Sequence, residues 1–125
     1  MIEPKVYTDS LLSISVTEDE EAINAAWSGK SIAREPGKFI TPLLMRLTKR
    51  CSDTDKRLML DFRRIEFMNS STITPVIKVL ERAKRGSSRL TVIYESESKW
   101  QELIFSALTI FSTDDGQVLL KGSDQ

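Results

Sequence analysis

Histidine is absent from this chain of 125 residues, and cysteine occurs once. Histidine is the most frequent general base in enzymes, a common zinc ligand and the side chain that titrates near neutral pH. Its absence excludes serine–histidine and cysteine–histidine catalysis. The single Cys51 excludes a disulfide within the chain, and we interpret it as an ordinary packed residue rather than a redox site. We therefore expect no catalytic residues.

An excess of charge of either sign is also missing, because 18 Lys and Arg residues balance 18 Asp and Glu residues. Such a chain has no overall field to hold nucleic acid or an anionic lipid surface. No apolar run approaches the roughly 20 residues that cross a bilayer. We expect a cytoplasmic protein that binds neither nucleic acid nor membrane.

The sequence signatures of phosphate, dinucleotide and metal sites are absent. There is no G-x-G-x-x-G, no G-x-x-x-x-G-K-[ST], no H-E-x-x-H and no cysteine cluster. The acidic run 18–21 and the pair Asp114-Asp115 are more typical of solvated turns than of metal ligands or an acid–base pair. We expect neither a cofactor nor a metal.

What the sequence does contain is the composition of an ordinary folded domain, with 40% hydrophobic and 29% charged residues. The length predicts a single domain over residues 1–125. Alternation of apolar and polar residues from Leu12 to Val16 predicts a strand, paired with residues 5–7 or with 23–32. The apolar run 58–62 predicts a strand covered on both faces. Further strands are expected at 90–94 and 117–120.

Three segments have helical spacing of apolar residues. One has its apolar positions from Phe39 onward, ahead of a polar loop at 52–55, and one plausible start has Thr41 as the cap and Pro42 at the first position. The second runs from about Ser71 to Arg85, and the expected apolar face consists of Ile73, Val76, Ile77, Leu80 and Ala83.

The third helical segment starts at Lys99, with Trp100 on its apolar stripe and Phe105 off it. The alternation of strands and helices predicts an α/β fold with a mixed central β-sheet. Its amino-terminal part is expected to be antiparallel, its central strands parallel, and its α-helices packed on the sheet.

The most informative segment joins the strand-like run to the second helix, where Ser70, Ser71 and Thr72 follow Asn69. A hydroxyl at this position caps a helix, but a cap needs one hydroxyl and three are present. A helix amino terminus also favours anions. A bound ligand anion and a phosphorylated serine are therefore both reasonable interpretations beside capping.

The run from Leu60 to Thr72, with the following helix and strand, resembles the STAS family of anti-sigma factor antagonists. The motif of that family is an apolar strand ending in Asp, a short turn, an aromatic, an aliphatic residue and Asp-Ser-Ser-Gly. Asp61 to Ser71 match in register, while Asn69 stands for the motif's Asp and Thr72 for its Gly. The stretch from Trp27 to Ile32 resembles the family's second strand.

This resemblance implies a STAS-like fold and a non-catalytic module in a partner-switching pathway. In the family, the second serine of the motif is phosphorylated by an anti-sigma factor that is also a kinase of the histidine-kinase-like ATPase fold, and a PPM-type phosphatase reverses the step. That serine is Ser71, and Ser70 is the first serine. SiaC-type regulators of diguanylate cyclases are also similar here, and their phosphorylated residue directly follows the Asn, which indicates Ser70. We expect partner contacts at Met68, Asn69, Thr72 and Ile73.

Overall fold

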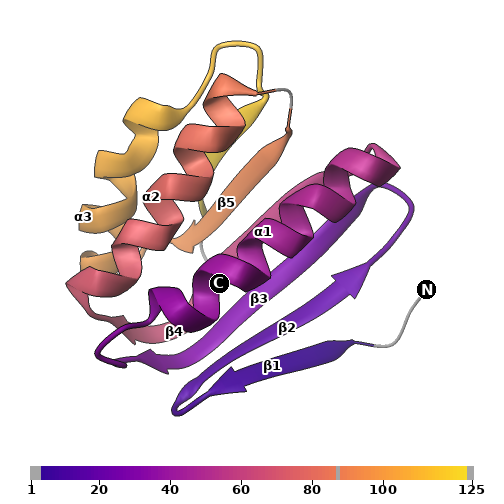
Figure 1. Ribbon diagram of the computed structural model, residues 1–125. Helices are drawn as coiled ribbons and strands as arrows, with labels where there is room; N and C mark the ends of the chain where they lie inside the picture. Colours follow the sequence, from indigo (N-terminus) through magenta and orange to yellow (C-terminus); the bar gives the residue numbers. More distant parts are fainter. Residues whose placement is uncertain (1–3, 87, 124–125) are drawn as a thin grey trace.

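A computed structural model describes residues 4–86 and 88–123 of the chain (Figure 1). The strands are β1 (Lys5–Asp9), β2 (Leu12–Glu18), β3 (Ala22–Ser31), β4 (Arg57–Met68), β5 (Leu90–Glu95) and β6 (Val118–Ser123). The helices are α1 (Gly37–Thr54), α2 (Ser70–Arg85) and α3 (Lys99–Ala107), and a short 3-10 helix at Leu108–Phe111 follows α3. No helix within these described ranges is long and apolar enough to cross a membrane.

The strands form one mixed sheet in the order β1-β2-β3-β4-β5-β6. The strands β1, β2 and β3 are antiparallel, and β3 to β6 are parallel. The expected α/β class, with its antiparallel amino-terminal part, is confirmed. The strands β4 and β5 are neighbours, with Leu58 beside Leu90 and Leu60 beside Val92, and α2 connects them.

All three helices lie on one face of the sheet (Figure 1). The expectation that the strand at 58–62 is covered on both faces is therefore wrong. Leu58, Leu60 and Phe62 are buried under the helices, whereas Met59 and Asp61, on the other face, are only half-buried. The strand is also longer than its apolar run, because β4 continues to Met68 and, beyond Phe62, only Ile65 and Met68 are buried.

Helix α1 begins at Gly37, so Thr41 is not its cap and Pro42 lies inside it. The polar residues expected to form a loop at 52–55 continue the helix to Thr54. The hydroxyl of Thr54 donates to the carbonyl of Arg50 at 2.6 Å and holds this last turn. Asp55 then ends α1 in the left-handed conformation, with φ at 55°.

The core of the sheet's helical face contains a row of aromatic rings. The ring centroids of Trp27 and Phe62 are 4.6 Å apart, and those of Phe62 and Phe105 are 5.0 Å apart. Tyr94 stacks on Phe105 with a centroid distance of 5.3 Å. Phe105 is fully buried, so the expectation that it lies off the apolar face is wrong, whereas Trp100 is half-buried and packs against the core.

The apolar face expected for the second helix is partly confirmed. Val76, Leu80 and Ala83 are buried, whereas Ile73 and Ile77 lie half-buried at the edge of the core. The buried face of the helix is shifted around its axis from the expected one, and it also includes Thr72, Pro75 and Val79.

Candidate functional site

The site begins where β4 ends and α2 starts, and Asn69 is the residue between them. Its Oδ1 accepts hydrogen bonds from the backbone N–H of Thr72 at 3.0 Å and from the hydroxyl of Thr72 at 2.7 Å. Its Nδ2 donates to the carbonyl of Ala33 at 2.9 Å. Asn69 is therefore the helix cap, in place of the hydroxyl cap considered from the sequence. The same side chain ties α2 to the loop between β3 and α1.

Ser70 and Ser71 are the first two residues of α2, and both are exposed. Neither hydroxyl has a hydrogen-bond partner among residues 4–86 and 88–123. Because Asn69 satisfies the helix end, the two serine hydroxyls are not needed for capping. Both are accessible to a modifying enzyme.

Thr72 and Met68 occupy different positions from those expected of partner contacts. Thr72 is fully buried, and its Oγ1 lies 2.6 Å from the hydroxyl oxygen of Ser31 on β3. Met68 is 5% exposed and belongs to the core. The expectation that these two side chains meet a partner is corrected, since both point into the molecule. Asn69 and Ile73 are half-buried and remain at the surface.

Two apolar side chains that the sequence did not single out as partner contacts are exposed at the ends of β3 and β4. Phe67 is 48% exposed and Ile32 is 47% exposed. Strand pairing places their backbones at the same edge of the sheet, because Lys30 lies beside Phe67 and Ser31 beside Met68. The backbone N–H of Asn69 also donates to the carbonyl of Ser31 at 3.0 Å. We call the four exposed residues Ile32, Phe67, Ser70 and Ser71 the serine surface.

The Asp at the middle of β4, which matches the strand-terminal Asp of the motif, is neutralised locally. Arg63 donates to Asp61 through Nε at 3.0 Å and Nη2 at 2.8 Å. Burial alone would raise the pKa of Asp61, but the hydrogen bonds from Arg63 outweigh it and lower this pKa. Asp61 is therefore ionised at neutral pH and paired with Arg63 on the same strand.

Three basic residues of α2 lie far from the serines along the helix. Arg82, Lys84 and Arg85 occupy the last turn of α2, at the end opposite the serines, where cations favour the helix dipole. Among the described residues, no group of three or more His, Cys, Asp or Glu side chains could hold a metal ion.

These features define an α/β domain of the STAS-like class, with two exposed serines at the start of the helix that follows its central strand. No protein-family model matches the chain, and no curated protein matches it. Its structure is similar to that of an uncharacterized protein of the DUF3478 family, with a SpoIIAA-like fold, from Shewanella loihica. The two are 14% identical, with a TM-score of 0.50, over 90% of this chain and 86% of the other. The similarity confirms the fold.

Proposed function

We propose that this protein is a regulatory interaction module of the anti-sigma factor antagonist type, controlled by reversible serine phosphorylation. The observation that supports the proposal is the serine surface. Two exposed hydroxyls without internal partners among the described residues begin the helix that follows β4, and Phe67 and Ile32 are exposed at the ends of β4 and β3. A partner that covers this surface buries apolar area and two neutral hydroxyls, which favours binding.

Phosphorylation would oppose that binding. A kinase of the histidine-kinase-like ATPase fold transfers the γ-phosphoryl group of ATP to the serine Oγ, which loses its proton, and ADP leaves. The phosphoserine brings about −1.5 to −2 charges, and the partner must desolvate or pair them to stay bound. A PPM-type phosphatase would hydrolyse the ester and restore the neutral surface.

Either serine fits this scheme. The STAS resemblance favours Ser71, with an anti-sigma factor as the partner, and the SiaC resemblance favours Ser70, with a diguanylate cyclase as the output. Thr72 is set apart from both because it is buried against Ser31. The threonine that replaces the motif's glycine therefore packs inside the fold and does not obstruct the serines.

The test begins with phosphosite mapping on protein isolated from its native cells, followed by pull-downs with variants. Ser71→Asp or Ser70→Asp should weaken partner binding by about tenfold or more, since the added charge must be desolvated. The matched control is Ser52→Asp, an exposed serine on α1. It should bind as the wild type does. Equal binding by all variants, with no phosphate on Ser70 or Ser71, would contradict the proposal.

A bound anion at the same helix end would give a different result. Nucleotides would then raise the melting temperature of the unmodified protein, because ligand binding to the native state stabilises it by mass action. Ser70→Asp and Ser71→Asp would abolish that shift without any phosphate being found.

A further inference from the structure

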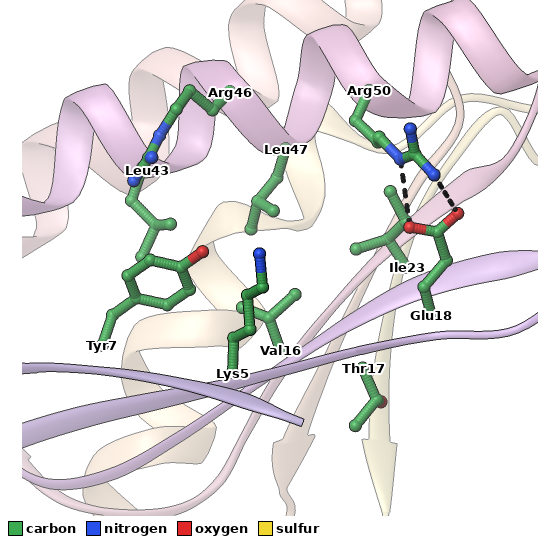
Figure 2. A pocket seen from close by; sticks show the side chains of 10 residues that line it. All are labelled: Lys5, Tyr7, Val16, Thr17, Glu18, Ile23, Leu43, Arg46, Leu47 and Arg50. Atoms are coloured by element: carbon green, nitrogen blue, oxygen red, sulfur yellow. Dashed lines mark hydrogen bonds and ion pairs between the residues drawn. The ribbon is translucent and has the colours of Figure 1, made fainter. Parts of the chain in front are cut away.

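A second surface of the molecule lies between α1 and the hairpin of β1 and β2, and neither serine lines it (Figure 2). It is a groove of about 340 Å³, which falls at the lower end of the range for small-molecule sites. The rim and the floor of the groove differ in polarity. Charged or polar side chains line its rim, and the floor is formed by Val16, Ile23, Leu43 and Leu47.

One end of the groove holds a carboxylate of the chain itself. Glu18 accepts two hydrogen bonds from Arg50, through Nε at 3.1 Å and Nη2 at 3.0 Å, and one from Lys56 at 2.6 Å. The hydrogen bonds from Arg50 have the largest effect and the one from Lys56 the next, and together they lower the pKa of Glu18 from 4.5 to about 2. An arginine of α1 and a lysine from outside the helix thus hold one carboxylate in a bidentate and charge-assisted arrangement.

The other end of the groove has the same pair of residue types without the carboxylate. Arg46 lies one helical turn before Arg50 on α1, and Lys5 rises from β1 toward the helix (Figure 2). Neither has an acidic partner within residues 4–86 and 88–123. The Cζ atom of Arg46 lies over the ring of Tyr7, 5.5 Å from the ring centroid. The hydroxyl of Tyr7 has no hydrogen bond among the described residues.

Three donors, the Lys5 ammonium, the Arg46 guanidinium and the Tyr7 hydroxyl, therefore lie around the apolar floor without an acidic partner among the described residues. A guanidinium stacked on an aromatic ring keeps its N–H edges free for a carboxylate. With Glu18 already held by Arg50 and Lys56, the groove retains the unpaired positive charge of Lys5 and Arg46. An organic anion with an apolar body would match both the sign of the charge and the apolar floor.

We propose that this groove binds a small organic carboxylate. Its carboxylate lies between Arg46, Lys5 and the Tyr7 hydroxyl, and its apolar body lies on Val16 and Leu47. The proposal does not depend on the serine surface, since none of these residues belongs to it.

The experiment is a titration of the full chain with two carboxylates, and two-dimensional amide NMR spectra monitor each addition. Octanoate supplies an aliphatic body and phenylacetate an aromatic one, so the two together show which body the floor prefers. Octanol and phenylacetamide have the bodies without the charge, and acetate has the charge without a body. We expect saturable shifts at Tyr7, Val16 and Leu47 with octanoate or phenylacetate, and weaker or no saturation with the three controls.

Variants separate this site from non-specific association. The double substitution Lys5→Gln with Arg46→Gln removes two exposed charges, together with the contact of Arg46 with the Tyr7 ring, and should weaken binding by about tenfold or more. Val16→Phe leaves the charge unchanged and should reduce binding by filling the floor. The matched control is Lys49→Gln, an exposed α1 residue outside the groove whose partner is Asp53, and it should bind as the wild type does.

Three results would overturn the proposal. The first is the absence of saturable binding by either carboxylate. The second is binding that survives loss of Lys5 and Arg46, or that octanol and phenylacetamide match. The third is a set of shifted amides that lies outside the groove. All three leave the phosphorylation proposal untouched.

Discussion

At the scale of single residues, the junction before α2 separates two tasks that one side chain often combines. Asn69 satisfies the helix end and holds the β3–α1 loop. Ser70 and Ser71 are left with free hydroxyls in the described structure. This division was not deducible from the sequence, because Ser, Thr and Asn all cap helices well and neighbour one another here.

Asn69→Ala should therefore destabilise the protein by about 1 to 2 kcal/mol, since it removes the cap and the bond to Ala33. Ser70→Ala and Ser71→Ala should change the free energy of unfolding by less than about 0.5 kcal/mol. Urea unfolding of the three variants measures the difference. A loss from Ser71→Ala as large as that from Asn69→Ala would show that the serine shares the capping role.

Glu18 predicts a pH dependence of stability. Its pKa is lowered from 4.5 to about 2 in the folded chain, mainly by the hydrogen bonds from Arg50 and Lys56. A carboxyl with a depressed pKa contributes stability above its unfolded pKa, and that contribution is lost as the pH falls through the folded value. Glu18→Gln should lower stability at neutral pH and flatten the decline between 4.5 and about 2.

Urea midpoints across that window measure this effect. The control is Glu20→Gln, an exposed residue of the adjacent turn, which should keep the wild-type slope. An unchanged slope in Glu18→Gln would show that the ion pairs do not persist in solution.

At the scale of elements, the sequence predicts the strands and the order of the fold well, because their apolar periodicity is local. The end of α1 was missed because its last turn is polar and is stabilised by contacts such as Lys49 with Asp53. The buried face of α3 was not predicted, because it includes the polar residue Gln101. Gln101 is buried because it forms hydrogen bonds with β4, and the sequence of α3 alone does not show this contact. In the candidate site, the sequence predicts the two serines. It does not predict Ile32, because Ile32 reaches this edge of the sheet only through the pairing of β3 with β4.

Gln101 illustrates how α3 and β4 depend on each other. The pairing of β4 with β5 ends at Asp61, and beyond it Gln101 Nε2 donates to the carbonyls of Phe62 at 3.0 Å and Ile65 at 3.1 Å. Its Oε1 accepts from the N–H of Glu95 at 2.8 Å. One side chain thus replaces strand hydrogen bonds where the sheet opens.

Gln101→Leu should cost about 2 to 4 kcal/mol, because it leaves three backbone groups without partners in the interior. Leu103→Ala, on the same helix and 74% exposed, is the control and should cost less than about 0.5 kcal/mol. Chemical denaturation distinguishes the two variants. Equal stabilities would mean that water replaces the glutamine.

At the scale of the whole molecule, Cys51 reports on the opening of the fold. It is 3% exposed in the core, and burial raises the pKa of its thiol to about 11. A buried thiol with a raised pKa reacts slowly, because the thiolate is the nucleophile. We expect modification by an aromatic disulfide reagent to follow global unfolding and to accelerate with urea in step with loss of structure. Fast modification of the native protein would show that α1 detaches locally from the sheet.

The separation of the cap from the serines has a consequence for experiments in cells. Cellular abundance depends on the fraction of a protein that is unfolded, and a destabilising substitution lowers it through proteolysis. Alleles that change Ser70 or Ser71 to alanine leave Asn69 and its hydrogen bonds in place. They should therefore accumulate to the normal level, and any phenotype they produce would reflect a lost signal rather than a lost protein.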